Sequence, residues 1–251
     1  MAVPLKSAED IARIREAGRV VASVLAELAR AAEPGISTLE LDRIAEAGAR
    51  RRGALPAFKG YLGYPASLCI SVNDEIVHGI PGSRVLRAAD IVGLDFGVEL
   101  HGFFGDAAVT VEVGQASPAA RRLVEATRSA LARAVEAAVA GGRVGDIGAA
   151  VQAHVEPLGY SVVRDFTGHG IGRRLHEPPQ VPNFGRRGTG AALRAGMVLA
   201  IEPMVNEGGP AVRTLGDGWT AVTADGRLSA HFEHTVAVTE EGPEVLTLAG
   251  H

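Results

Sequence analysis

The stretch Leu94–Asp106, "LDFGVELHGFFGD", places two aspartates in a run of residues that otherwise favours buried β-strands. A buried carboxylate without a partner is costly, so both aspartates require compensation. A hairpin that turns near Leu100 and His101 would place Asp95 directly opposite Asp106. Side chains paired in this way lie roughly 4.5–5.5 Å apart at Cβ, so like charges repel unless a cation lies between them. The alternative is a pair of turn-flanking aspartates with no ligand, and at this point both interpretations stay open.

The composition indicates a folded soluble protein and gives little support to nucleic-acid binding. Of 251 residues, 47% are hydrophobic and 22% charged, the net charge is −4, and no basic face is obvious. The single cysteine, Cys69, excludes an internal disulfide and fits a reducing compartment. The first ten residues, "MAVPLKSAED", lack a secretory apolar segment, and no apolar run reaches the roughly 20 residues of a membrane span. We therefore expect a cytoplasmic protein. The 23 arginines against two lysines also suggest a high-GC bacterial genome.

Two helices followed by a series of strands occur twice along the chain. Ser7 and Ser37 are suitable caps for the first two helices, and Ser117-Pro118 begins the third. A shorter fourth helix is expected after Asp146, and strand-like segments follow each helical pair. This order predicts an α+β protein with one domain made of two similar halves. The expected boundaries are 1–251 for the domain and about 1–114 and 115–251 for the halves.

The second half supplies further polar residues in apolar surroundings. Glu202 ends the apolar strand "MVLAIE", and Glu233 lies inside "LSAHFEHTVAV". The segment "TGHGIGRRLHEPPQ" places His169 and His176 in a glycine-rich loop. A nucleotide-binding loop would be followed by a helix, whereas His-Glu-Pro-Pro follows here, so that interpretation fails. No lysine or arginine is close in sequence to any of the four acidic residues, which favours a metal over an ion pair.

Four carboxylates and one imidazole form an oxygen-rich ligand set that suits Mn(II), Fe(II), Co(II) or Zn(II). Such a set is unlike a structural zinc site, which is built from thiolates. Four negative charges neutralise two divalent cations, which points to a two-metal centre with a spacing of roughly 3.5–4 Å. A water bridging two such ions is a hydroxide near neutral pH and can attack a carbonyl carbon. The ligand set therefore predicts metal-assisted hydrolysis.

Five successive motifs resemble those of type I methionine aminopeptidases, in order and over nearly the whole chain. They are "SVNDEIVHGIPG", "DIVGLDFGVELHGFFGDAAVTVEVG", "TGHGIGRRLHEPPQVPN", "MVLAIEPMVN" and "LSAHFEHTVAVT". The resemblance implies the pita-bread fold, in which two pseudo-symmetric halves with an antiparallel sheet covered by helices enclose a dinuclear metal site. It also implies removal of the N-terminal methionine from nascent proteins and peptides when the second residue is small, by a metal-bridging hydroxide.

By this resemblance, Asp95 would bind one metal ion, His169 and Glu202 would bind the other, and Asp106 and Glu233 would bridge the two. The two aspartates of the opening stretch would then be held together by cations.

The same resemblance gives catalytic roles to three residues. His78 would contact the substrate near the scissile bond, and His176 would bind the carbonyl oxygen and stabilise the oxyanion. Glu202 would handle the proton of the attacking water. In contrast, His231 and His234 flank Glu233 and are expected to point to the opposite face in structural roles. Solvent exposure is expected for the three remaining histidines, which are His101, His154 and His251.

The methionine side chain would occupy an apolar pocket, for which thioether sulfur and aromatic rings are well matched. For Cys69 a purely structural role as a small buried residue is an equal alternative, and a nucleophilic role is not expected. Many family members have an aromatic residue at the position of Leu175, immediately before His176. The predicted pocket residues are Phe58, Tyr61, Tyr64, Cys69, Leu175 and Trp219, together with His78 and His176.

Two alternatives share the fold: an Xaa-Pro aminopeptidase or dipeptidase, and a binding protein that has lost catalysis. The first group usually carries an extra N-terminal domain, whereas here a helix begins by about residue 8, and the second group loses metal ligands. The resemblance further implies a monomer, of the short bacterial form, that acts on the N-terminal peptides of nascent proteins and contacts the ribosome transiently. The Met-Ala start predicts that the protein removes its own Met1.

Overall fold

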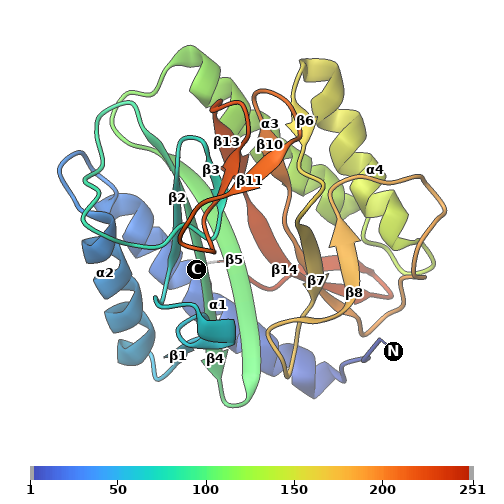
Figure 1. Cartoon of the computed structure of the whole chain (residues 1–251). Helices are drawn as coiled ribbons and strands as arrows, with labels where there is room; N and C mark the ends of the chain where they lie inside the picture. Colours follow the sequence, from blue (N-terminus) through green and yellow to red (C-terminus); the bar gives the residue numbers. More distant parts are fainter. Residues whose placement is uncertain (1–2, 249–251) are drawn as a thin grey trace.

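The chain begins with two helices, α1 (Ala8–Ala31) and α2 (Thr38–Arg51). Ser7 caps α1 as predicted, because its hydroxyl accepts from the backbone N–H of Asp10 while the Asp10 carboxylate accepts from the N–H of Ser7. Ser37 caps α2 by accepting from the N–H of Glu40. The computed structural model describes residues 3–248 (Figure 1), so the predictions for Met1 and His251 lie outside the described residues.

Within residues 3–248, nine strands form one antiparallel sheet in the order β1-β4-β5-β14-β9-β7-β8, with β2 added to β4 and β15 to β14. Two smaller antiparallel sheets have the orders β13-β10-β6 and β11-β12-β3. The strands are β1 (Leu55–Pro56), β2 (Cys69–Val72), β3 (Glu75–Val77), β4 (Ile91–Leu100), β5 (Phe103–Glu112), β6 (Ser161–Val162), β7 (Thr167–Gly170), β8 (Glu177–Pro182), β9 (Val198–Ile201), β10 (Met204–Asn206), β11 (Val212–Thr214), β12 (Ala221–Thr223), β13 (Ser229–His231), β14 (Glu233–Thr239) and β15 (Gly242–Val245).

The two longest strands, β4 and β5, form a hairpin whose turn differs from the predicted one. Leu100 pairs with Phe103, so the loop consists of His101 and Gly102. Both loop residues have positive φ, 53° and 81°, which suits the right-handed twist of a two-residue hairpin. The turn is therefore one residue later than expected from the sequence.

This later turn shifts the register of the two aspartates by two residues. Asp95 pairs with Ala108, and Asp106 pairs with Gly97, so the predicted direct opposition of Asp95 and Asp106 is wrong. A shift of two keeps both carboxylates on the same face of the sheet, as diagonal neighbours. A Cβ atom at position 97 would lie 2.8 Å from the ring of Phe58 and 3.2 Å from Asp106 Oδ1, so the glycine makes room for the carboxylate.

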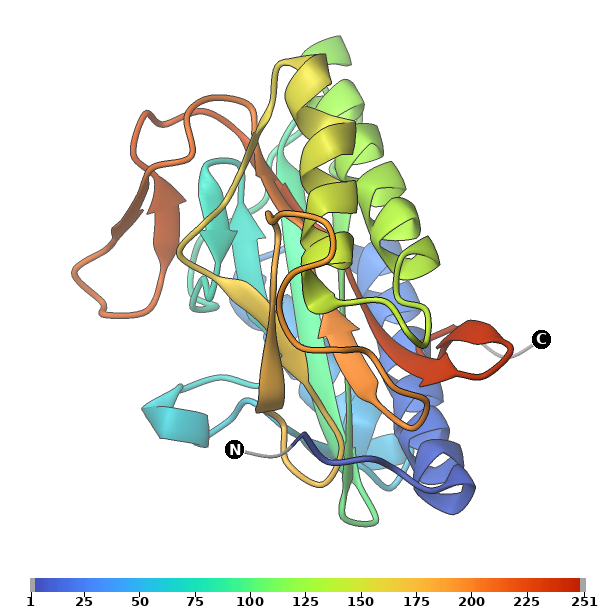
Figure 2. The same cartoon turned by 90° about the vertical axis from the view of Figure 1, so that its right-hand side faces the viewer.

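Figure 2 shows the helices gathered on one side of the large sheet. The second helical pair is α3 (Pro118–Glu136) and α4 (Val144–Val155). Short 3-10 turns, η1 (Tyr61–Gly63) and η2 (Glu156–Leu158), occur in the connections. Residues of α1, α2 and β4 share one buried apolar cluster, and residues of α3, α4, β9 and β14 share another. The α+β class with a helix-covered antiparallel sheet is confirmed.

Successive side chains of β4 alternate between the helix-covered face of the sheet and the opposite face. Leu94 and Phe96 are fully buried against the helices, while Asp95 and Gly97 point to the opposite face. No helix within residues 3–248 combines the length and apolarity that crossing a membrane requires. The division into one domain with two similar halves stays a prediction.

Candidate metal centre and substrate pocket

A cavity of about 190 Å³ lies on the face of the sheet opposite the helices. The structure brings every predicted site residue to this one cavity, although the residues come from segments throughout the chain. Leu62 also lines it and was not predicted. The lining residues are Phe58, Tyr61, Leu62, Tyr64, Cys69, His78, Asp95, Asp106, His169, Leu175, His176, Glu202, Trp219 and Glu233.

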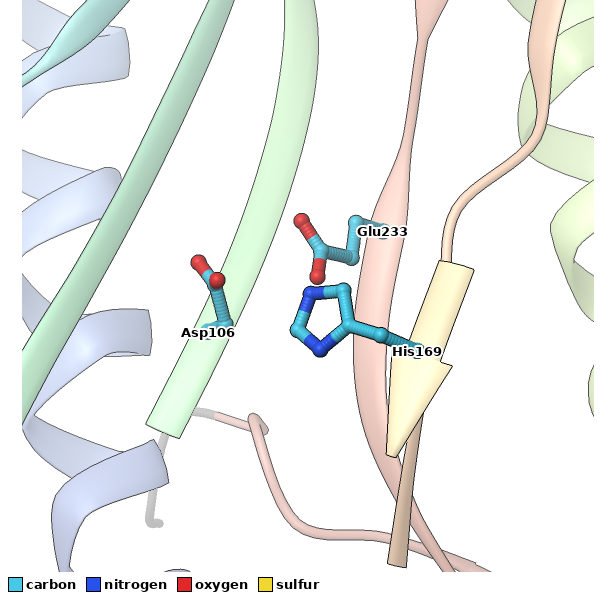
Figure 3. Close-up of side chains that lie close together, drawn as sticks. All are labelled: Asp106, His169 and Glu233. Carbon is cyan, nitrogen blue, oxygen red and sulfur yellow. The ribbon is translucent and has the colours of Figure 1, made fainter. Parts of the chain in front are cut away.

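Three of the predicted ligands form a compact group. Asp106 on β5, His169 on β7 and Glu233 on β14 each offer one ligand atom, and these atoms all lie within 4.8 Å of one another. Figure 3 shows the three side chains pointing toward one another from separate strands. Strand pairing fixes this convergence, because Glu233 pairs with Ala108, two residues from Asp106. All three side chains are buried, so their orientation is held by the surrounding strands.

Three carboxylates of the cavity each have one oxygen without an internal partner in residues 3–248. Within the described part of the chain, Asp95 Oδ1, Asp106 Oδ1 and Glu233 Oε1 are buried without a hydrogen-bond partner. Buried polar atoms are nearly always satisfied, so these orphaned oxygens point to a missing cation. Burial raises the pKa of Asp95 to about 7. Burial, followed by the repulsion of neighbouring carboxylates, raises the pKa values of Asp106 and Glu233 well above their ordinary range. The donor set therefore fits divalent metal ions.

His169 has the surroundings that a neutral, metal-binding imidazole requires. Its Nδ1 lies 2.9 Å from the carbonyl oxygen of Gly170, and its Nε2 lies 3.7 Å from Glu202 Oε1. Burial lowers the pKa of His169 to about 3, and the proximity of His176 adds to this effect. Burial also raises the pKa of Glu202 well above its ordinary value. A neutral imidazole with one nitrogen bonded to a backbone carbonyl is the usual form of a metal-binding histidine.

The prediction that His169 lies in a loop is wrong, because the residue is in strand β7. The adjacent glycine explains why a glycine-rich segment can form a strand here. A Cβ atom at Gly170 would lie 2.3 Å from the carbonyl oxygen of Pro178 on the neighbouring strand. Glycine at this position thus allows close pairing of β7 with β8, and the segment becomes irregular only after it.

His231 was expected to point away from the site, and this expectation is wrong. Its Nε2 lies 3.8 Å from Glu202 Oε2, and it is buried without a hydrogen-bond partner within residues 3–248. A residue two positions before Glu233 shares its face in an extended chain, which is the signal that could have identified it. Phe232 separates β13 from β14 and packs into the cluster under the helices. His234 does lie on the other face, where its Nδ1 is 2.8 Å from Thr247 Oγ1.

The two predicted substrate-binding histidines lie at the edge of the carboxylate group. His78 directly follows β3 and has a left-handed backbone, φ 61°, an uncommon conformation that is often found at functional sites. Its ring packs edge-on against Phe166, and burial lowers its pKa to about 4. His176 lies beside His169 with ring centroids 4.1 Å apart, and its Nδ1 is 2.9 Å from Tyr61 Oη.

The apolar part of the cavity adjoins the carboxylates. Phe58, Tyr64, Cys69 and Leu175 are buried in one apolar cluster, and Trp219 packs edge-on against Tyr64 with centroids 5.1 Å apart. Burial, with the charge of Asp95 nearby, raises the pKa of the Cys69 thiol, so the thiol is protonated at neutral pH. This state agrees with the expectation that the cysteine is not a nucleophile.

Leu62 forms part of the rim and is 81% exposed. An isolated leucine between Tyr61 and Gly63 has no feature in the sequence that would mark it as a cavity residue. Leu62 reaches the rim because of the conformation of its loop, which could not be predicted from the sequence.

The model of metallopeptidase family M24 matches residues 12–240 of this sequence. The chain belongs to metallopeptidase family M24. Among its relatives, a methionine aminopeptidase of Clostridium perfringens is 54% identical over 97% of this chain and 98% of its own length. The crystal structure of a methionine aminopeptidase from Thermotoga maritima superposes with a TM-score of 0.97 at 44% identity, over 98% of this chain and all of the other. This places the chain in the methionine aminopeptidase branch of the M24 family and confirms the pita-bread fold.

The alternative within the M24 family is not favoured. An Xaa-Pro dipeptidase from Bacillus anthracis matches with a TM-score of 0.78 and 25% identity, and the alignment covers 98% of this chain but only 62% of that protein. The lower similarity and the additional length of the dipeptidase both separate it from this chain. As a member of the M24 family, the chain is a metal-dependent peptidase.

Proposed function

We propose that this protein removes the N-terminal methionine from peptides and nascent proteins whose second residue is small. The observation that carries the proposal is the convergence of the five predicted ligands beside an apolar pocket in one cavity. Orphaned carboxylate oxygens in that cavity match the donor chemistry of divalent cations. The relatives named methionine aminopeptidase, at about half identity over nearly the full length, support the same activity.

The proposed centre holds two divalent ions, chosen from Mn, Fe, Co and Zn. Asp95 would hold one ion, His169 and Glu202 would hold the other, and Asp106 and Glu233 would contribute to holding both. The compact group of Asp106, His169 and Glu233 supports this arrangement. Bound divalent ions acidify a water molecule and polarise the scissile carbonyl. The remaining catalytic and substrate-binding roles are assigned to side chains that line the cavity.

His176 donates a hydrogen bond to the scissile carbonyl oxygen and stabilises the negative charge that develops there, a contact worth about 3–4 kcal/mol in comparable sites. His78 contacts the substrate near the scissile bond. Glu202, which lies in the cavity beside His169, accepts the proton of the attacking water. The methionine side chain packs against Phe58, Tyr64, Cys69, Leu175 and Trp219, which lie together beside the carboxylates.

In the cell we expect a cytoplasmic monomer that contacts the ribosome transiently and folds as one domain over residues 1–251. The net charge of −4 does not indicate a general affinity for nucleic acid, so any such contact would be local.

The test uses metal-free protein to which Mn(II), Co(II), Fe(II) or Zn(II) is returned separately. Each preparation is offered the peptides Met-Ala-Ser and Ala-Pro-Ser, and released amino acids are quantified. We expect free methionine only with metal and no cleavage of the proline peptide. Glu233→Gln is expected to abolish release, whereas Glu240→Gln, an exposed glutamate on the turn after β14, leaves it unchanged. Cleavage of the proline peptide alone, or release without metal, would contradict the proposal.

A further inference from the structure

Two imidazoles lie side by side in the cavity but have different hydrogen-bond partners. The rings of His169 and His176 have centroids 4.1 Å apart and are tilted by 46°. One ring nitrogen of each has a partner outside the pair, the Gly170 carbonyl oxygen for His169 and the Tyr61 phenol for His176. A neutral imidazole has one N–H donor and one acceptor nitrogen, and the partner of one nitrogen decides the role of the other.

For His169 the partner fixes the proton on Nδ1. The carbonyl oxygen of Gly170, 2.9 Å away, can only accept, so Nδ1 carries the hydrogen. The Nε2 atom, which points toward Glu202, is left with a free electron pair, as a metal ligand requires.

For His176 the partner is a phenol, which favours the reverse arrangement. Tyr61 Oη lies 2.9 Å from Nδ1, and it makes no other hydrogen bond to the described residues. If Nδ1 donated, the phenol hydrogen would face no acceptor in residues 3–248 and would bond to solvent instead. If the phenol donates to Nδ1, both atoms are satisfied and Nε2 carries the hydrogen. Burial raises the pKa of Tyr61, so the phenol retains its hydrogen at neutral pH.

We propose that Tyr61 is a positioning residue that holds His176 in the Nε2–H tautomer, so that this nitrogen donates to the scissile carbonyl oxygen of the substrate. The inference rests on the proposed function for the identity of the acceptor. Adjacent histidines would then have opposite tautomers, one accepting toward the metal and the other donating toward the substrate.

The loop that carries Tyr61 is built to hold the phenol in this place. The tyrosine ring stacks on the ring of His176, with centroids 5.2 Å apart and an angle of 24° between the planes. Around it, Gly60, Leu62 and Gly63 have φ values of 85°, 49° and 89°, so the backbone turns through left-handed conformations on both sides of Tyr61. Such a conformation costs free energy at Leu62 and requires glycine at the other two positions.

The first experiment observes the tautomer directly, without reference to activity. Metal-free protein labelled with ¹⁵N-histidine is studied by long-range ¹H–¹⁵N correlation, and the His176 signals are assigned with His176→Gln. We expect the hydrogen on Nε2 of His176 in the wild type and a mixture of tautomers in Tyr61→Phe, which keeps the stacked ring. Tyr160→Phe, in a tyrosine packed against the helical core outside the cavity, should leave the wild-type tautomer unchanged. A hydrogen on Nδ1 of His176 in the wild type would overturn the proposal.

The second experiment measures methionine release by metal-loaded Tyr61→Phe. We expect kcat to fall by about 5–10-fold, the effect of one ordinary hydrogen bond, while KM changes little. In a His176→Ala background the same substitution should have no further effect, because the two residues act as one unit. Equal losses in both backgrounds, or a loss confined to KM, would mean that Tyr61 only lines the pocket. Absence of methionine release by the wild type would overturn the proposed function but leave the tautomer to be decided by the first experiment.

Discussion

Buried carboxylates in this protein have two different environments: one is paired with a lysine, and the others have no cationic side chain beside them in residues 3–248. Glu177 forms an ion pair with Lys6, with Nζ 2.7 Å from Oε2 and side-chain exposures of 4% and 6%. Its other oxygen accepts from the backbone N–H of Arg174. Asp106 and Glu233, which are equally buried, each have an orphaned oxygen and no cationic partner within residues 3–248.

The difference separates a structural carboxylate from a functional one. Lys6 comes from the segment before α1, and Glu177 directly follows His176, so the ion pair anchors the loop that carries this histidine. At the proposed metal centre, residues 3–248 supply no lysine or arginine, and the carboxylates remain available to external ions. Four predictions test this contrast.

The largest effect is expected at the metal centre. Glu233→Gln should lower kcat/KM for methionine release by about 10³-fold or more, because a ligand worth several kcal/mol to the transition state is lost. The metal-free variant should nevertheless be at least as stable as metal-free wild type, because a neutral amide replaces a buried carboxylate. Peptide kinetics and urea unfolding in chelator measure the two quantities. A variant that loses stability without metal would show that Glu233 has an internal partner.

The ion pair should show the opposite behaviour. Lys6→Met leaves Glu177 buried without its cation and should lower the free energy of unfolding by about 3–5 kcal/mol, with or without metal. The chain offers a matched control in its only other lysine, because Lys59 pairs with Glu46 at the surface with 51% of its side chain exposed. Lys59→Met should cost about 0–1 kcal/mol. Similar losses for both variants in urea unfolding would refute the structural role of the buried pair.

His231 allows a finer test of how the metal centre is supported. Because its Nε2 is close to Glu202 Oε2, we expect it to orient this ligand, and His231→Leu should weaken metal binding by about 10-fold. His234→Leu, in the neighbouring histidine on the other face of the strand, should leave metal affinity unchanged. Calorimetric titration of metal-free protein with Mn(II) measures the affinities. Unchanged affinity in His231→Leu would return this residue to the structural role expected from the sequence.

The smallest expected effect is a pH dependence of the metal-free protein. Because histidines of the unfolded chain also titrate near pH 6.5, the contribution of Asp95 is isolated as the stability of metal-free wild type relative to metal-free Asp95→Asn. The raised pKa of Asp95, about 7, keeps a proton on the folded chain that the unfolded chain has lost. Between pH 6.5 and 8.5 this relative stability should therefore fall as pH rises, by about 1 kcal/mol, and level off above the pKa of Asp95. Metal-loaded protein should not show this decrease, because ions replace the protons. A flat profile in chelator would contradict the missing-cation interpretation.

The sequence indicated the residues of the proposed metal centre better than the contacts that surround them. Carboxylates inside apolar strands are locally conspicuous, so Asp95, Asp106, Glu202 and Glu233 could be found without coordinates. The register of the hairpin could not be found in the same way. It depends on the positive φ of both His101 and Gly102, and the sequence of this turn is compatible with several turn types.

Contacts between distant segments were also missed. Lys6 and Glu177 are separated by 171 positions, and nothing local in either segment indicates their pairing. The hydrogen bond between Tyr61 and His176 likewise depends on where one loop folds over another. Local patterns thus identified residues that are unusual in their own segment, whereas pairing across the fold required the structure.

The most direct test of the missing-cation account is an anomalous difference map from crystals of the protein grown with Mn(II). The account predicts two peaks, one beside Asp95 and the other beside His169 and Glu202, with Asp106 and Glu233 between them. It would be contradicted by a map without peaks in this cavity, in which the carboxylates are instead satisfied by protons or by a side-chain cation of the protein.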